Sequence, residues 1–189
     1  MVNYYPMKKS NLFGSLFLIL VFAVVSSFAQ IPVKEVPADY GYVVKMGDQM
    51  PAFSTMLING KSLSNADFKG KVVMLQFTAS WCSVCRKEMP FIERDIWQKQ
   101  KNNKNFVLIG VDLDEPIEKV KKFQEDIKIS YPMALDPGGK IFGLVAEKKA
   151  GVTRNVILDK TGKIVYLTRL YKEDEFAEMV KVIGQLLKQ

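Results

Sequence analysis

Two nearly continuous apolar runs constrain the fold of this chain more than any other feature. One run spans 71–77 and the other spans 106–113. Strands that are apolar on both faces have to be covered on both faces, as in the sheets of α/β proteins. Between the two runs, Cys85, Met89 and Ile92 recur at helical spacing and predict an amphipathic helix. The chain is therefore predicted to contain a strand, a helix and a second strand in that order.

The second half of the chain has a different order of elements. Pro116 suits the first turn of a helix that continues to Ile127, and a short strand is predicted at 132–135. Residues 155–159 and 164–168 flank a Lys-Thr-Gly-Lys turn and predict a β-hairpin. The last helix is predicted to bury Phe176, Met179, Val180, Ile183 and Leu187. A β-α-β half followed by a β-β-α half predicts an α/β sandwich around one central sheet.

The N-terminal segment has the layout of a secretory signal peptide. Lys8 and Lys9 precede an apolar run at 16–25, and Ser27 and Ala29 are the small residues of a cleavage site. The run is shorter than the roughly 20 residues that a membrane-spanning helix needs, which disfavours the alternative of a retained anchor. We therefore expect cleavage after Ala29 and a location in the periplasm or the cell envelope, an oxidising compartment.

The predicted domain organisation has three parts. We expect a signal peptide at 1–29, an extended arm or linker at 30–45 and a single domain at 46–189, which is long enough to bury a core. The formal net charge is +7, but the basic residues are scattered among acidic ones and form no stripe. We therefore expect no nucleic-acid partner, and we expect a monomer.

The stretch TASWCSVCRKEMP, residues 78–90, contains both cysteines of the chain, Cys82 and Cys85. A zinc site needs about four ligands, mostly Cys and His, and this chain has no histidine, so we expect no metal. A purely structural disulfide that closes so small a loop would restrain the unfolded chain only weakly. A redox-active pair that needs no cofactor is the favoured interpretation, with the metal site and the structural disulfide as alternatives.

The positions of the two cysteines predict different roles. Cys82 follows the end of a strand and lies where the helix begins, so unpaired backbone N–H groups and the helix dipole favour its thiolate. Cys85 lies one turn later, on the buried stripe with Met89. Right-handed crossovers would place both at the carboxyl end of the first core strand, where α/β folds carry their sites. We expect Cys82 to be the exposed cysteine that attacks a disulfide, and Cys85, the more buried one, to resolve the mixed disulfide.

The motif WCxxCRKEMP after an apolar strand closely resembles the TlpA/ResA family of thioredoxin-like thiol-disulfide oxidoreductases, which are secreted or tethered to membranes. The resemblance extends from about Gly47 to the C-terminus, and 155–164 is similar to the family's second-half hairpin. It implies a thioredoxin-like three-layer sandwich with a central mixed sheet and an N-terminal extension. It also implies client proteins that carry disulfides, a membrane thiol-disulfide electron carrier as partner, and substrate contacts by Trp81, Thr153 and Arg154.

The chain departs from the thioredoxin pattern in two places. Thioredoxins keep a buried carboxylate six residues before the first cysteine, where this chain has Gln76, which cannot accept a proton near neutrality. Glu115 matches a glutamate of the ResA-like branch, so we expect it to handle the proton of Cys85; alternatively, it only complements a helix dipole. The loop that faces the cysteines has Thr153 in place of the superfamily's cis-proline, so a trans bond is expected there.

These features together favour a reductase of protein disulfides that acts through Cys82 and Cys85. A peroxiredoxin-like thiol peroxidase is the alternative enzyme, in which Arg154 would offer a cation to a thiolate or peroxide. It is disfavoured because Met74 and Ala79 occupy the spacings at which the peroxidase signature has proline and threonine. A third alternative is a non-enzymatic thioredoxin-fold binding module with an incidental disulfide.

Overall fold

The computed structural model of the protein describes residues 1–3 and 35–189. The cleavage site predicted after Ala29 and the apolar run of the predicted signal peptide lie outside the described residues. Within the described part, no helix has the length and apolar character that crossing a membrane requires.

The centre of the described fold is a mixed five-stranded sheet in the order β5-β4-β3-β6-β7. Its strands are β3 (Val72–Thr78), β4 (Phe106–Leu113), β5 (Met133–Asp136), β6 (Arg154–Leu158) and β7 (Ile164–Arg169). β3 pairs in parallel with β4, and β4 with β5, whereas β6 runs antiparallel to both β3 and β7. A separate antiparallel pair consists of β1 (Ser54–Met56) and β2 (Ser62–Ser64). The predicted β-hairpin and the predicted mixed sheet are both confirmed.

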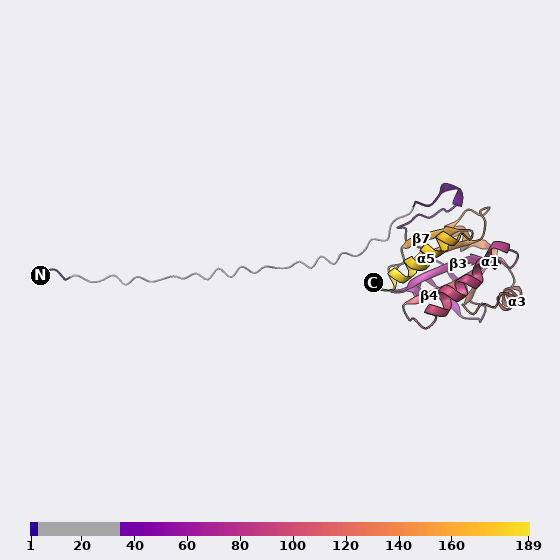
Figure 1. Cartoon of the computed structure of the whole chain (residues 1–189), viewed down its shortest axis with the longest axis horizontal. Helices are drawn as coiled ribbons and strands as arrows, with labels where there is room; N and C mark the ends of the chain where they lie inside the picture. The colour runs from indigo at the N-terminus through magenta and orange to yellow at the C-terminus, as the bar shows by residue number, and fades with distance from the viewer. Residues whose placement is uncertain (4–34) are drawn as a thin grey trace. The chain divides into compact units, whose positions relative to one another are not determined.

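Helices pack against this sheet, with α1 and α5 crossing in front of it in Figure 1. The helices are α1 (Ser83–Ile92), α2 (Gln98–Gln100), α3 (Ile117–Ile127), α4 (Phe142–Val145) and α5 (Glu173–Leu186). A π-helical segment, Glu93–Trp97, joins α1 to α2, and short 3-10 turns occur at Ala38–Tyr40, Asn65–Phe68 and Pro137–Gly139. Phe91 of α1 and Phe176 of α5 are in edge contact, with ring centroids 6.3 Å apart. The predicted α/β sandwich is therefore confirmed.

Two helical details differ from the prediction. Pro116 is the N-cap of α3 and does not lie in its first turn. In α5, Val182 and Leu186 are buried, whereas Val180 and the C-cap residue Leu187 are only half-buried. Both half-buried residues lie at the edge of the apolar stripe, because each helical residue advances the face by about 100°. The helical spacing of the predicted stripe was correct, but the buried face is turned slightly about the helix axis relative to the prediction.

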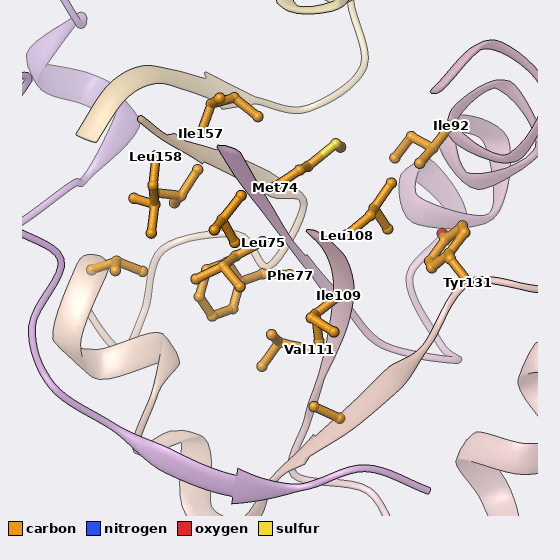
Figure 2. Packing of buried hydrophobic residues seen from close by; sticks show 14 of the residues in the cluster. Met74, Leu75, Phe77, Ile92, Leu108, Ile109, Val111, Tyr131, Ile157 and Leu158 are labelled. Atoms are coloured by element: carbon orange, nitrogen blue, oxygen red, sulfur yellow. The ribbon is translucent and has the colours of Figure 1, made fainter. Parts of the chain in front are cut away.

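The side chains of β3 alternate between the two faces of the sheet, and all seven residues of the strand are buried. Figure 2 shows Met74 pointing toward Ile92 of α1, whereas Leu75 points to the opposite face. Because the side-chain period of a strand is two, Gln76 and Thr78 lie on the same face as Met74. A polar side chain on β3 is therefore directed at the helix that begins with the cysteine pair.

Gly110, in the middle of β4, leaves room for a buried tyrosine. A Cβ atom at this position would lie 2.4 Å from the Met133 sulfur and 3.2 Å from the Tyr131 ring. Tyr131 is fully buried, and its hydroxyl donates a hydrogen bond of 2.7 Å to Oε1 of Gln76. The space left by the glycine thus allows the tyrosine to satisfy a buried glutamine close to α1.

The described part of the predicted arm, residues 35–45, packs against the domain. The Val43 N–H donates to the Val145 carbonyl at 2.9 Å, and the Tyr42 hydroxyl donates to the Thr168 carbonyl in β7. The Tyr42 ring lies against the guanidinium of Arg154, 4.5 Å from ring centroid to Cζ. This segment therefore contacts β6 and β7 from a position more than 100 residues earlier in the chain.

Tyr42→Leu should destabilise the protein by about 2 to 4 kcal/mol, because it removes a partly buried hydrogen bond and the aromatic face over a buried cation. Urea unfolding of the full chain measures this free energy. Tyr42→Phe is the matched control, since it keeps the ring and should cost only about 1 kcal/mol. A leucine variant as stable as the wild type would show that the arm contributes nothing to folding.

Candidate active site

Cys82 and Cys85 lie at the junction between β3 and α1, where they form a disulfide with Cα atoms 5.3 Å apart. Cys82 is the N-cap of α1, and its sulfur accepts a hydrogen bond from the Cys85 N–H at 3.2 Å. An N-cap lies beside backbone N–H groups that have no partner within the helix. The prediction that α1 begins at Cys82 is therefore confirmed, and a negative charge on this sulfur would be stabilised there.

The burial of the two cysteines differs less than predicted. Cys85 is completely buried, and Cys82 is only 8% exposed. The expectation of an exposed Cys82 was therefore too strong for this disulfide form, although Cys82 is still the more accessible of the two. Cys85 shares its buried face with Met89, as the helical stripe predicted.

Thr153 lies directly against the disulfide. Its Oγ1 is 3.1 Å from the Cys82 sulfur and 3.3 Å from the Cys85 sulfur, and its side chain is buried. The peptide bond between Val152 and Thr153 is trans, as expected for a non-proline residue. The structure thus brings Thr153 and the cysteines together.

Trp81 presents an apolar surface next to Cys82. It is 63% exposed and lines a cavity of about 330 Å³. The other lining residues are Leu113, Asp114, Gly138, Gly139, Phe142 and Lys148. Such a surface is suited to contact with a bound protein segment, because exposed aromatic side chains are enriched where proteins bind one another.

The third predicted client contact, Arg154, lies against the arm. It is fully buried, and its guanidinium lies over the rings of Tyr42 and Phe142, with its Cζ 4.5 Å and 5.8 Å from their centroids. Its Nε donates to the Gly151 carbonyl at 2.9 Å, and burial lowers its pKa. The side chain of Arg154 is therefore buried against the arm in this structure, and its predicted contact with a substrate stays a prediction.

Glu115 lies beside the active-site turn and binds Ser80, two residues before Cys82. Its carboxylate accepts hydrogen bonds from the Ser80 N–H at 2.5 Å and the Ser80 hydroxyl at 2.8 Å, and it pairs with Lys119 at 2.5 Å. Burial raises the pKa of Glu115, but the hydrogen bonds from Lys119 and Ser80 outweigh burial and lower it below its usual value. Glu115 is thus an ionised group that fixes the turn.

Glu88 is a buried acid that the sequence analysis missed. It lies on α1 one turn after Cys85 and is 2% exposed, and one carboxylate oxygen accepts a 2.7 Å hydrogen bond from the Asn155 amide. Burial raises its pKa to about 7, although hydrogen bonds from Asn155 and Gln76 act in the opposite direction. The sequence signal that could have indicated this buried acid is the position of Glu88 on the same helical face as Cys85 and Met89. A buried carboxylate thus lies on the helix that faces Gln76.

A second buried acid, Asp112, lies at the carboxyl end of β4, paired in register with Thr78 of β3. Burial, and next the negative charge of Glu115, raise the pKa of Asp112 to about 8. Asp112 therefore keeps its proton at neutral pH, while Glu115 carries the charge. The signal in the sequence was an acid inside an otherwise apolar strand.

The arrangement is suited to thiol-disulfide exchange. A disulfide lies at a helix N-terminus, a hydroxyl contacts both sulfurs, and an acid with a pKa near neutrality lies one turn along the same helix. Among the described residues, no cluster of three or more His, Cys, Asp or Glu side chains is placed to hold a metal ion. The chemistry that these groups can perform is transfer of two electrons and protons through sulfur.

Comparison with known proteins agrees with this geometry. The Redoxin family matches residues 45–183. A thiol-disulfide oxidoreductase ResA of Bacillus cereus is 30% identical over 162 residues, which cover 84% of this chain and 88% of that protein.

Two solved structures have the same fold. A solution structure from Bacteroides thetaiotaomicron, described as a candidate protein disulfide isomerase, is 55% identical with a TM-score of 0.77, and the match covers 79% of this chain and 94% of that one. The thioredoxin domain of a thiol-disulfide oxidoreductase from Bacteroides vulgatus is 27% identical with a TM-score of 0.61, over 74% of this chain and 97% of that one. The chain therefore belongs to the Redoxin family and is, within it, a thioredoxin-like thiol-disulfide oxidoreductase.

Proposed function

We propose that the protein reduces disulfides of client proteins outside the cytoplasm, through a mixed disulfide between Cys82 and the client. The observation that carries this proposal is the position of Cys82 as the N-cap of α1, with the Cys85 N–H directed at its sulfur. A thiolate at this position is favoured by the helix N-terminus, which is what an attacking cysteine requires. Cys85 is completely buried and is therefore suited to resolve the mixed disulfide.

The reaction takes place in two exchange steps. The Cys82 thiolate attacks one sulfur of the client disulfide, so that a Cys82–client bond forms, the client S–S bond breaks and a client thiolate leaves. The Cys85 thiol then loses its proton and attacks the Cys82 sulfur, which releases the second client thiolate. Two electrons pass from the dithiol to the client, both client thiolates take up protons, and the Cys82–Cys85 disulfide remains.

Resolution needs a group that accepts the proton of Cys85, and Glu88 is better suited to this role than Glu115. A general base works best when its pKa is close to the working pH. The pKa of Glu88 is about 7, whereas that of Glu115 is below its usual value. We therefore assign the proton of Cys85 to Glu88 and give Glu115 the role of holding the Ser80 turn.

Trp81 and Thr153 are the proposed client contacts, because one is exposed beside Cys82 and the other contacts both sulfurs. After each reaction cycle the disulfide has to be reduced again, and an oxidising compartment does not supply electrons. A thiol-disulfide electron carrier in the membrane is the partner that this cycle requires. The signal-peptide layout of residues 1–29 supports a location in the periplasm or the cell envelope. We also propose that the protein acts as a monomer.

Cys85→Ser should trap mixed disulfides with client proteins in the native host, because the attacking sulfur stays and the resolving sulfur is removed. Cys82→Ser is the matched control and should trap few. Non-reducing gels and mass spectrometry of the envelope fraction count the mixed-disulfide adducts. The intact mass of the same protein shows whether residues 1–29 have been removed. Equal trapping by the two variants would reject the assigned roles, and a peroxide-driven reaction without adducts would favour the peroxidase.

Glu88→Gln should slow resolution of the mixed disulfide and flatten its pH–rate profile near pH 7. It should also change the pH dependence of stability. An acid whose pKa rises from 4.5 to about 7 on folding keeps a proton that the unfolded chain loses. As the pH rises from 4.5 to about 7, Glu88 should therefore lower the free energy of unfolding of the wild type by about 1.4 kcal/mol for each pH unit.

The glutamine variant should lack the part of the loss of stability that comes from Glu88 and keep the part that comes from Asp112, whose pKa is also raised, to about 8. Urea unfolding of both proteins at several pH values measures the difference. Glu115→Gln is the matched control with the opposite sign, because a lowered pKa stabilises the protein above the ordinary value and this stability disappears as the pH falls. If only Glu115→Gln flattens the pH–rate profile, the proton of Cys85 belongs to Glu115.

The reduction potential of the Cys82–Cys85 couple should lie nearer to about −270 mV than to about −120 mV. Strong oxidants depend on an unusually stable thiolate, and this chain has no histidine to provide one between the cysteines. Equilibration with glutathione or dithiothreitol measures the potential. A value above roughly −180 mV would exclude a reductase and favour an oxidant or isomerase.

A further inference from the structure

The hydroxyl of Thr153 contacts both sulfurs of the redox pair at once. Its Oγ1 lies 3.1 Å from the Cys82 sulfur and 3.3 Å from the Cys85 sulfur. A threonine hydroxyl has one proton to donate and two lone pairs that accept. A proline, the residue expected here from the thioredoxin pattern, has no side-chain donor and no N–H. Thr153 therefore adds a hydrogen-bonding group at a position where a proline would provide only an apolar contact.

Contacts on both sides of Thr153 hold its backbone in place next to the cysteine pair. The Thr153 carbonyl accepts a hydrogen bond from the Leu170 N–H at 3.1 Å, and the residue is 2% exposed. The next residue, Arg154, pairs with Phe77 of β3 and is covered by the Tyr42 ring. Because β3 leads into Cys82, the sheet itself sets the distance between the hydroxyl and the sulfur. A donor held in this way requires little rearrangement when charge develops on its partner.

Titratable groups of both signs lie on the elements that surround the cysteine pair. They include the acids Glu88 on α1, Asp112 in β4 and Glu115, which binds Ser80, and the cation Arg86 on α1, whose Nε donates to the Ser80 carbonyl. The guanidinium of Arg154, the cation nearest in sequence to Thr153, is directed at the rings of Tyr42 and Phe142. The stabilising groups with contacts to the Cys82 sulfur are thus the Cys85 N–H and the Thr153 hydroxyl.

We propose that, in the reduced protein, the Thr153 hydroxyl donates a hydrogen bond to the Cys82 thiolate and accepts one from the Cys85 thiol. Thr153 is then a catalytic residue that touches both reacting atoms, beyond its role in client contact. The proposal rests on the assignment of Cys82 as the attacking cysteine. A hydrogen bond to a charged group favours the charged form, so the hydroxyl increases the fraction of Cys82 that is ionised.

Thr153→Val removes the hydroxyl and preserves the shape of the side chain. At a fixed pH below the pKa of Cys82, it should lower the rate of Cys82 alkylation by iodoacetamide about tenfold, because a hydrogen bond to a charged group contributes about 1.5 kcal/mol or more. Mass spectrometry of the reduced full chain identifies the alkylated cysteine. Thr153→Ser should restore the rate. Thr78→Val is the matched control, since the Thr78 hydroxyl contacts the Met89 sulfur and not the cysteines.

An unchanged alkylation profile in a folded Thr153→Val protein would overturn the proposal, as would an equal effect of Thr78→Val. Thr153→Ala is the second variant and should show the same loss, because the effect belongs to the hydroxyl and not to packing. A third measurement needs no variant. In the reduced wild type, NMR should detect a slowly exchanging Thr153 hydroxyl proton close to the Cys82 β-protons, and a freely exchanging hydroxyl would contradict the proposal.

Insulin reduction measured on the same samples separates this inference from the proposed function. A shifted alkylation profile in a protein that reduces no disulfide would support the role of the hydroxyl and reject the reductase. An unshifted alkylation profile in a protein that does reduce disulfides would reject the role of the hydroxyl and support the reductase.

Discussion

The structure depends on covering both faces of β3. Because every residue of this strand is buried, the chain has to place packed elements on each side of the sheet, and α1 is the first of them. The parallel pairing of β3 with β4 then requires a crossover, so α1 has to begin at the carboxyl end of β3. The open N–H groups of α1 and the cysteine that caps them are a consequence of this requirement.

The same constraint explains where the buried acid lies. Strand alternation directs Gln76 at α1, and the helix supplies Glu88 on the face that packs against the strand. A carboxylate on either element could occupy this space, but two would repel each other in a medium of low dielectric constant. The neutral amide of Gln76 on the strand and the acid Glu88 on the helix avoid this repulsion and can form a hydrogen bond with each other. Tyr131 completes the set by donating to Gln76, in the space that Gly110 leaves.

Features determined by local pattern could be predicted from the sequence, and those determined by distant contacts could not. The limits of β4 agree with the apolar run at 106–113, and the N-cap at Cys82 followed from a strand end before a helical stripe. The burial of Arg154 depends on Tyr42, which lies 112 residues earlier, so no local pattern indicated it. Glu88 was missed for a different reason. A charged residue within an amphipathic helix is usually expected on the exposed face, so the apolar spacing of Cys85 and Met89 did not predict that Glu88 is buried.

The Arg154 contact explains how this loop keeps its place without a proline. Proline fixes a loop by removing backbone freedom, whereas threonine has no such restriction. Here the restriction comes from the neighbouring residue, since Arg154 pairs with β3 through its backbone and contacts the rings of Tyr42 and Phe142 through its side chain. Thr153 is therefore positioned by packing, and its side chain is free to provide a hydroxyl. The arm, through Tyr42, thus belongs to the structure that supports the redox pair.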